Sequence, residues 1–269
     1  MKVIRSFAWG AALAAALCVT VVAQQAPAGY HQIYCVKVKP GRDAQFNAMV
    51  NGDLRKLVQY DLNSGRLSSW IVLSAMIPAG EEAPCDAAVI YFYPGLPPAP
   101  QSDAAMAAEL QKAIGKTPQE FDQELEANAT LVIDNITRYL SLVGGAKKGD
   151  YLVFNSMKVP NLDAWAAWEK TDWQPFAEAS VKDGALSGWA LNVQIFPHGA
   201  KVKDAASTVD IYPTYQAAIS GPFGNGGMDR WKKVHPGESV DDAMDQGAKL
   251  CTIESSVLYK VEDAVFASK

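Results

Sequence analysis

The sequence predicts an α+β protein in which two tandem β-α-β-β-α-β units pack together as one barrel. Two observations lead to this prediction. The segment 65–70, Gly-Arg-Leu-Ser-Ser-Trp, recurs 119 residues later as 184–189, Gly-Ala-Leu-Ser-Gly-Trp. Around each of these segments, the hydrophobic periods typical of strands and helices follow one another in the same order. The chain therefore has the pattern of one unit present twice.

Other matches between the two copies keep the same order along the chain, at offsets of 119 or 120 residues. The matching pairs include Pro40 and Pro160, Pro78 and Pro197, Tyr93 and Tyr212, and Tyr139 and Tyr259. Chance similarity would not maintain this order over nearly the whole chain. We therefore interpret the two copies as an internal duplication.

The first copy begins with a strand over residues 30–39, which are rich in β-branched and aromatic side chains and are followed by Pro40-Gly41. Apolar residues at helical spacing from Phe46 to Val58 then predict a helix that begins at Asp43 and stops before Asn63-Ser64-Gly65. Two strands, 67–77 and 87–93, follow around a connection that contains proline and glycine.

The rest of the first copy is a helical region and a last strand. Thr117-Pro118-Gln119-Glu120 offers an N-cap, a proline at the first helical position and a capping-box acid, so a helix is expected to start there. A strand over 131–143 completes the copy.

The second copy repeats this order of elements. Its strands are expected over 151–159, 186–196, 207–212 and 250–261, and its helical regions over 163–182 and 221–247. Pro175 lies inside the first of these helical regions and should kink or interrupt it.

Residues 1–23 have the pattern of a secretory signal peptide. Lys2 and Arg5 precede an apolar run over 7–22, and Val21-Val22-Ala23 supplies a small-residue cleavage site. We expect export to the periplasm or the medium and no membrane attachment after cleavage, with a retained membrane anchor as the alternative. The expected domains are then a signal peptide over 1–23, a first repeat over 24–145 and a second repeat over 150–269.

Charge and cysteine content limit the partners. The chain has 24 basic and 29 acidic residues, and removal of Lys2 and Arg5 with the signal peptide leaves a net charge of −7. This balance argues against nucleic acid or an anionic membrane as a partner. Cys35, Cys85 and Cys251 remain; they could form one disulfide and one free thiol, or could all be buried as small hydrophobic residues.

A β-α-β-β-α-β unit typically forms a ferredoxin-like antiparallel sheet with both helices on one face, which leaves the other face bare. Two fused units can bury these faces against each other. The sequence thereby resembles the dimeric α/β-barrel superfamily, which includes NIPSNAP-like, antibiotic-biosynthesis monooxygenase-like, EthD-like and chlorite dismutase-like proteins. The resemblance rests on the paired Gly-x-Leu-Ser-x-Trp turns, on Trp173-Gln174-Pro175-Phe176, and on Lys233-Val234-His235-Pro236-Gly237.

The resemblance implies a site for a small, partly apolar ligand between the sheet and the helices, and we place it in the second copy. The expected ligand-binding residues are Trp165, Trp168, Asn192, Gln194 and Tyr212. Core packing is the alternative for the two tryptophans, since aromatic residues at helical spacing commonly cover a sheet.

A competing hypothesis is a cofactor-free oxygenase- or isomerase-like enzyme in which His235 is the base and Asp210 or Glu254 assists. In the alternative, His235 caps a helix end and the carboxylates lie on a wet strand face. We expect no cofactor; haem would need His235 as its iron ligand. His31 and His198 are expected at the surface, and the histidine spacing gives no sign of a metal site.

A third hypothesis is an interaction module that pairs with itself or with a partner protein, which an exposed aromatic patch would support. A homo-oligomer is compatible with each hypothesis. Whether the protein is an enzyme stays open at this point.

Overall fold

The computed structural model describes residues 29–199, 202 and 206–267, so the predicted signal peptide lies outside the described residues. The first half follows the order strand, helix, two strands, helices, strand. Its elements are β1 (Tyr30–Val38), α1 (Asp43–Met49), the π-helical segment η1 (Val50–Leu54), α2 (Arg55–Ser64), β2 (Ser69–Ile77), the short 3-10 turn η2 (Gly80–Glu82), β3 (Ala87–Tyr93), α3 (Asp103–Ile114), α4 (Pro118–Asn128) and β4 (Ala129–Gly144).

The second half follows the same order with one more helix. Its elements are β5 (Tyr151–Lys158), α5 (Leu162–Trp168), the π-helical segment η3 (Glu169–Trp173), α6 (Gln174–Lys182), β6 (Gly188–Phe196), β7 (Ala206–Tyr212), α7 (Tyr215–Ser220), α8 (Gly227–Val234), α9 (Val240–Leu250) and β8 (Thr252–Phe266). The segment 221–226, expected to be helical, forms turns before α8.

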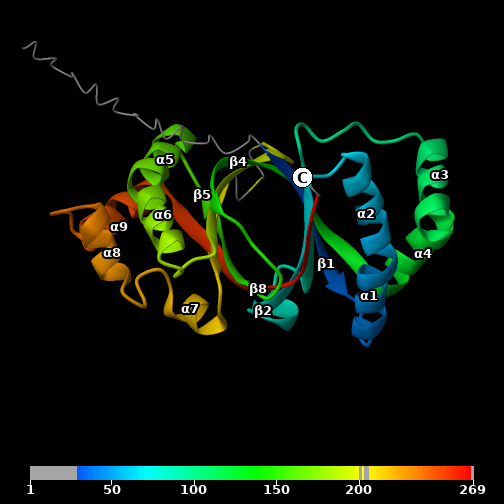
Figure 1. Cartoon of the computed structure of the whole chain (residues 1–269), viewed down its shortest axis with the longest axis horizontal. Coiled ribbons are helices and arrows are strands. Elements are labelled where there is room, and N and C mark those ends of the chain that lie inside the picture. The colour runs from blue at the N-terminus through cyan, green and yellow to red at the C-terminus, as the bar shows by residue number, and fades with distance from the viewer. Residues whose placement is uncertain (1–28, 200–201, 203–205, 268–269) are drawn as a thin grey trace, which may run out of the picture.

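All eight strands join in one closed antiparallel barrel with the order β1-β3-β2-β8-β5-β7-β6-β4. Each half contributes four adjacent strands, and the β2–β8 and β4–β6 ladders join the halves. The helices of the first half cover one side of the barrel and those of the second half cover the opposite side (Figure 1). The predicted α+β barrel is therefore confirmed.

Local sequence signals account for several element boundaries. The Thr117 hydroxyl accepts a hydrogen bond from the Glu120 N–H, and the Glu120 carboxylate accepts one from the Thr117 N–H, so the expected capping box starts α4. Gly65 ends α2 with a φ of 77°, and Gly184 has a φ of 75° after α6. A side chain is strained at such angles, which explains why both repeated segments begin with glycine.

The first helical region of each half is interrupted by a π-helical segment. In the second half, η3 ends two residues before Pro175, so the expected interruption is present. The first half carries η1 at the same place without a proline. The interruption is therefore a feature of both halves and does not depend on Pro175 alone.

The strand segments that lie under the helices are covered on both faces. Trp70 packs against the helices with Phe46 and Val58, whereas its neighbour Ile71 faces the barrel interior with Val261. In the second half, Trp189 packs against the helices in the same way. Apolar residues are thus needed on both faces, in agreement with the 49% hydrophobic content of the chain.

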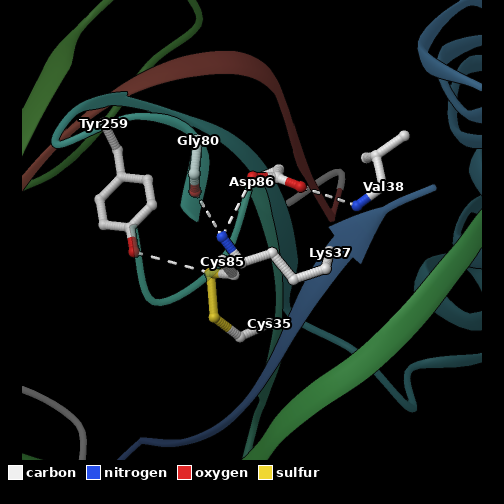
Figure 2. Close-up of a disulfide and its surroundings, with 7 residues drawn as sticks. All are labelled: Cys35, Lys37, Val38, Gly80, Cys85, Asp86 and Tyr259. Carbon is white, nitrogen blue, oxygen red and sulfur yellow. Dashed lines mark hydrogen bonds and ion pairs between the residues drawn. A yellow bond between two sulfur atoms is a disulfide. The ribbon is translucent and has the colours of Figure 1, made fainter. Parts of the chain in front are cut away.

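Cys35 and Cys85 form a disulfide, and Cys251 is a half-buried free thiol. The disulfide joins β1 to the connection between β2 and β3 (Figure 2). The same connection is held by Asp86, whose carboxylate accepts a hydrogen bond from the Val38 N–H at 2.9 Å, and by Lys37, which donates to the Gly80 carbonyl at 2.6 Å. This end of the barrel is therefore fixed by both covalent and polar links.

We predict that the Cys35→Ser/Cys85→Ser double variant loses stability. The disulfide closes a loop across 50 residues. Chain entropy then gives a loss of about 4 kcal/mol in the free energy of unfolding. Urea unfolding followed by tryptophan fluorescence measures the change, with Cys251→Ser as the matched control that should stay close to the parent. Equal midpoints for the double variant and the parent would contradict the prediction.

Candidate functional site

A cavity of about 470 Å³ lies inside the barrel. All eight strands contribute to its lining, so it lies within the ring of strands, open at one end, and not between the sheet and the helices. Its position is at the end of the barrel where β1, β2, β5 and β6 finish. Its volume suits a small organic ligand.

The cavity has two chemically different walls. One wall is apolar and comes from β1, β2 and β3: its residues are Ile33, Cys35, Leu73, Ala88 and Ile90. The other wall carries hydroxyl and amide groups: its residues are Asn135, Thr137, Ser156, Gln194, Ser207 and Ser255. The cavity therefore matches a molecule that is apolar on one side and polar on the other.

The disulfide and a tyrosine meet at this cavity. Cys35 and Tyr259 both line it, and the Tyr259 hydroxyl lies 3.7 Å from the Cys85 sulfur (Figure 2). The covalent link therefore fixes part of the cavity wall. A wall segment that is fixed before binding lowers the ordering cost of binding.

Charge is almost absent from the cavity. Asp134 is the one charged side chain among the described lining residues, and its carboxylate accepts a hydrogen bond from the Gln32 amide at 2.7 Å. None of the described lining residues is a lysine, arginine or histidine. The described part of the cavity thus suits an uncharged ligand, because an isolated charge would be costly to bury there.

Two of the five expected ligand-binding residues belong to the barrel interior. Gln194 lines the cavity, and Asn192 lies two residues away on β6, on the same face and almost fully buried. The other three, Trp165, Trp168 and Tyr212, belong to the layer between the sheet and the helices.

This layer does not offer the expected ligand site, because its aromatic side chains fill it. Trp165 has no exposed surface. Trp168 packs so closely on α9 that a Cβ atom at Gly247 would lie 2.6 Å from its ring. The hollow beside Tyr212 measures only about 10 Å³. Around these three residues the side chains are closely packed, whereas the cavity of about 470 Å³ lies in the barrel interior.

The three candidate catalytic residues are not brought together. His235 ends α8, where its Nε2 lies 2.8 Å from the Asp172 carbonyl oxygen and its ring lies 4.4 Å from that of Trp231. Asp210 faces the helix layer from β7, and Glu254 is exposed at a bulge in β8. His235 thus holds a helix end against the preceding π segment, as the alternative interpretation expects.

The remaining two histidines differ in their exposure to solvent. His198 is exposed in the connection after β6, as expected. His31 is not at the surface: it is only 4% exposed and faces the barrel interior, where it stacks on Tyr139. The expectation for His31 was wrong because β1 lies between β3 and β4 in the closed barrel, so that its inward-facing side chains are covered.

A buried pair of carboxyl groups lies under the helices of the second half. Burial, and after it the neighbouring Asp210 carboxyl, raises the pKa of Glu169 to about 8. Burial raises the pKa of Asp210 to about 7, although a hydrogen bond from the Asn155 amide at 3.4 Å opposes this. Glu169 Oε2 and Asp210 Oδ1 have no hydrogen-bond partner among the described residues.

The first half fills the same two places with uncharged residues. Glu169 is the first residue of η3 and corresponds to Val50, the first residue of η1. Asp210 pairs with Trp189 in the β6–β7 ladder and corresponds to Tyr91, which pairs with Trp70 in the β2–β3 ladder. The fold therefore does not require acids at these places. Asp210 was a sequence candidate and Glu169 was not, although Glu169 lies four residues after the buried Trp165 and so on the same helix face.

The described residues do not form a metal site or a haem site around His235. Within the described ranges, no group of three His, Cys, Asp or Glu residues can hold a metal ion. His235, the one haem ligand considered, has Nε2 at the Asp172 carbonyl and Nδ1 3.5 Å from a Glu238 carboxylate oxygen, so it does not fit that role. No helix among the described residues is long and apolar enough to span a membrane.

Solved structures share this architecture. A "Putative monooxygenase" from Fusobacterium nucleatum aligns over 89% of this chain and 94% of its own, with a TM-score of 0.55 and 8% identity. A second, from Lactobacillus acidophilus, aligns over 90% of this chain and 100% of its own, with a TM-score of 0.51 and 9% identity. The likeness is one of fold. No protein-family model matches the sequence, and no curated protein matches it significantly.

We predict that the Glu169–Asp210 pair makes stability fall as pH rises. Both carboxyls keep protons in the folded state that the unfolded chain releases above about pH 4. Stability is therefore lost progressively from about pH 4 up to about pH 8, the folded pKa of Glu169. Thermal unfolding across pH 4–9 should show this slope.

Glu169→Gln and Asp210→Asn should each flatten the slope and be more stable than the parent at pH 8.5, by about 1.4 kcal/mol for each unit of pKa shift removed. Glu178→Gln, on the exposed surface of α6, is the matched control and should leave the slope unchanged. The half-buried Asp61, whose pKa is raised to about 6 by burial, keeps part of the slope below that pH. A slope above pH 6 that is unchanged in the double variant would refute the assignment.

Proposed function

We propose that the protein binds a small, uncharged, partly apolar molecule inside the barrel. The observation that carries this proposal is the cavity of about 470 Å³ with one apolar and one polar wall. The ligand class is the one expected from the sequence, whereas the site is in the barrel interior. Gln194 belongs to the polar wall, with Asn192 beside it.

We further propose that the protein works outside the cytoplasm, in the periplasm or the medium. Two independent features support this. Residues 1–23 have the composition of a cleavable signal peptide. The Cys35–Cys85 disulfide is of a kind that persists in oxidising compartments and is rare in the cytosol.

We also propose that the two halves, 24–145 and 150–269, are copies of one ferredoxin-like unit. The strand order supports this proposal, because it is β4-β1-β3-β2 in the first half and, correspondingly, β8-β5-β7-β6 in the second. The π-helical segments η1 and η3, at the same place in each half, support it as well. In this proposal the chain is a fused member of the dimeric α/β-barrel superfamily, near its NIPSNAP-like or antibiotic-biosynthesis monooxygenase-like branches. Further homo-oligomerisation remains compatible with it.

Oxygenase- or isomerase-like turnover is the second candidate function. The fold shared with two proteins described as monooxygenases favours it. Such chemistry would take place in the barrel cavity, and His235 would not be its base, because its Nε2 is engaged by the Asp172 carbonyl outside the cavity. Oxygen uptake with a hydroquinone as trial substrate would test it, and unchanged dissolved oxygen would count against it.

An interaction module has weaker support. The expected sign was an exposed aromatic patch. Among the described residues, the exposed large aromatic side chains are Phe196, Tyr215 and Phe266. They belong to the end of β6, to α7 and to the end of β8, and Phe196 and Phe266 lie at opposite ends of the barrel.

The ligand proposal is tested with N-phenyl-1-naphthylamine, a neutral probe whose fluorescence increases in an apolar site. We predict saturable binding by the parent protein, and at least about tenfold weaker binding by Ala88→Phe, which fills the cavity from its apolar wall. Ser207→Phe should do the same from the polar wall.

Ala105→Phe, on the exposed surface of α3, is the matched control and should bind the probe like the parent. Circular dichroism checks that each variant is folded. Unchanged probe affinity in both cavity-filling variants would refute the proposed site.

A further inference from the structure

The polar wall of the cavity offers hydrogen-bond acceptors where β4 and β6 meet. Thr137 and Gln194 are direct partners in this ladder, and both line the cavity. The Thr137 hydroxyl donates to the His31 carbonyl oxygen at 3.3 Å, and the Gln194 amide nitrogen donates to the Pro197 carbonyl oxygen at 2.6 Å. The Thr137 oxygen and the Gln194 side-chain carbonyl therefore remain as acceptors.

Two buried polar atoms lie next to this wall without a partner. His31 pairs with Thr137 across β1 and β4, and its Nδ1 has no hydrogen-bond partner among the described residues. Asn192 is 2% exposed, faces inward opposite Tyr139, and its Oδ1 likewise lacks a described partner. A buried polar atom without a partner is costly, so the Asn192 oxygen calls for a donor from elsewhere, and so does His31 Nδ1 in the tautomer that carries its proton on Nε2.

His31 is suited to accept a hydrogen bond over the ordinary pH range. Burial lowers its pKa to about 3, so the imidazole is neutral at pH 5 to 8. A neutral imidazole has one acceptor nitrogen. Its ring is held between Tyr139, at 4.5 Å between ring centroids, and Phe92, at 5.4 Å.

The other half shows that the barrel does not need these polar groups. The β2–β8 ladder occupies the place of the β4–β6 ladder, and Ala75 pairs there with Tyr259 as Gln194 pairs with Thr137. The counterpart of Asn192, which pairs with Tyr139, is Leu73, which pairs with Val261. The counterpart of His31, which pairs with Phe92, is Leu152, which pairs with Ile211. Apart from the Tyr259 hydroxyl, the side chains at these positions are apolar.

We propose that the acceptor wall, defined as Thr137 and Gln194 with His31 and Asn192 behind them, recognises a hydroxyl or N–H donor on an otherwise apolar ligand. The apolar part of the ligand lies on the opposite wall, against Ala88, Ile90 and the disulfide. This inference rests on the proposed ligand site in the barrel. It names the ligand class: an uncharged molecule with a ring or chain body and a donor on one edge.

The test compares two probes of similar shape, 2-naphthol, which has an O–H donor, and 2-methoxynaphthalene, which has none. The parent protein should bind 2-naphthol about tenfold more tightly, because only 2-naphthol can donate to the acceptor wall. Titrations at pH 7 keep 2-naphthol uncharged.

The variants copy the residues of the other half, so they keep side chains that the barrel already accommodates. Gln194→Ala copies Ala75, His31→Leu copies Leu152, and Asn192→Leu copies Leu73. Gln194→Ala and His31→Leu should each reduce the preference for 2-naphthol to about threefold or less, with little change for 2-methoxynaphthalene. Tyr215→Phe, which removes an exposed hydroxyl on α7 outside the cavity, is the matched control and should keep the full preference.

The outcomes separate this inference from the proposed ligand site. Equal affinity of the parent for both probes would overturn the acceptor wall and leave the ligand site in place. A preference that survives in folded Gln194→Ala and His31→Leu would also overturn the acceptor wall. Failure of both naphthalenes and of N-phenyl-1-naphthylamine to bind would overturn both proposals.

Discussion

The four-stranded sheet of each half ends in two edge strands whose backbone groups need partners, and it has an apolar face that needs a cover. The β2–β8 and β4–β6 ladders meet both needs, since they pair the edges and enclose the inner faces in one barrel. The outer faces are then free to bind the helices. The position of the cavity depends on this closure, because its lining comes from strands of both halves.

The two halves share an architecture but differ in chemistry. Under the helices, Val50 and Tyr91 of the first half occupy the positions that correspond to Glu169 and Asp210 in the second half. Within the barrel, most inward-facing side chains of the β2–β8 ladder are apolar, whereas those of the β4–β6 ladder include Thr137, Asn192 and Gln194. One half thus acts as an internal control for the other. Polar groups that the apolar half replaces without loss of the fold are the best candidates for function.

Local signals predicted most elements: the alternating and helical hydrophobic patterns, and the capping box at Thr117, each depend on neighbouring residues. The faces of the strands were not predictable in the same way, because both faces are covered and alternation is lost. Asp210 and Tyr212 were therefore expected at the ligand but face the helices.

The register in which the strands pair could not be predicted from the repeat either. The offset of 120 aligns Asp134 with Glu254. In the ladders, Asp134 pairs with Tyr34 of β1, but the corresponding residue of β5, Asn155, pairs with Ser256 and not with Glu254. One-residue bulges in β4 and β8 shift this register, and no local motif marks them.

The central claim is that the ligand lies inside the barrel with its donor toward the β4–β6 ladder. A crystal structure with 6-bromo-2-naphthol tests it most directly, since anomalous scattering locates the bromine. The account predicts bromine against Ala88 and Ile90, and the hydroxyl oxygen within hydrogen-bond distance of Thr137 or Gln194. Bromine between the sheet and the helices beside Tyr212, or a hydroxyl directed at Leu73, would contradict it.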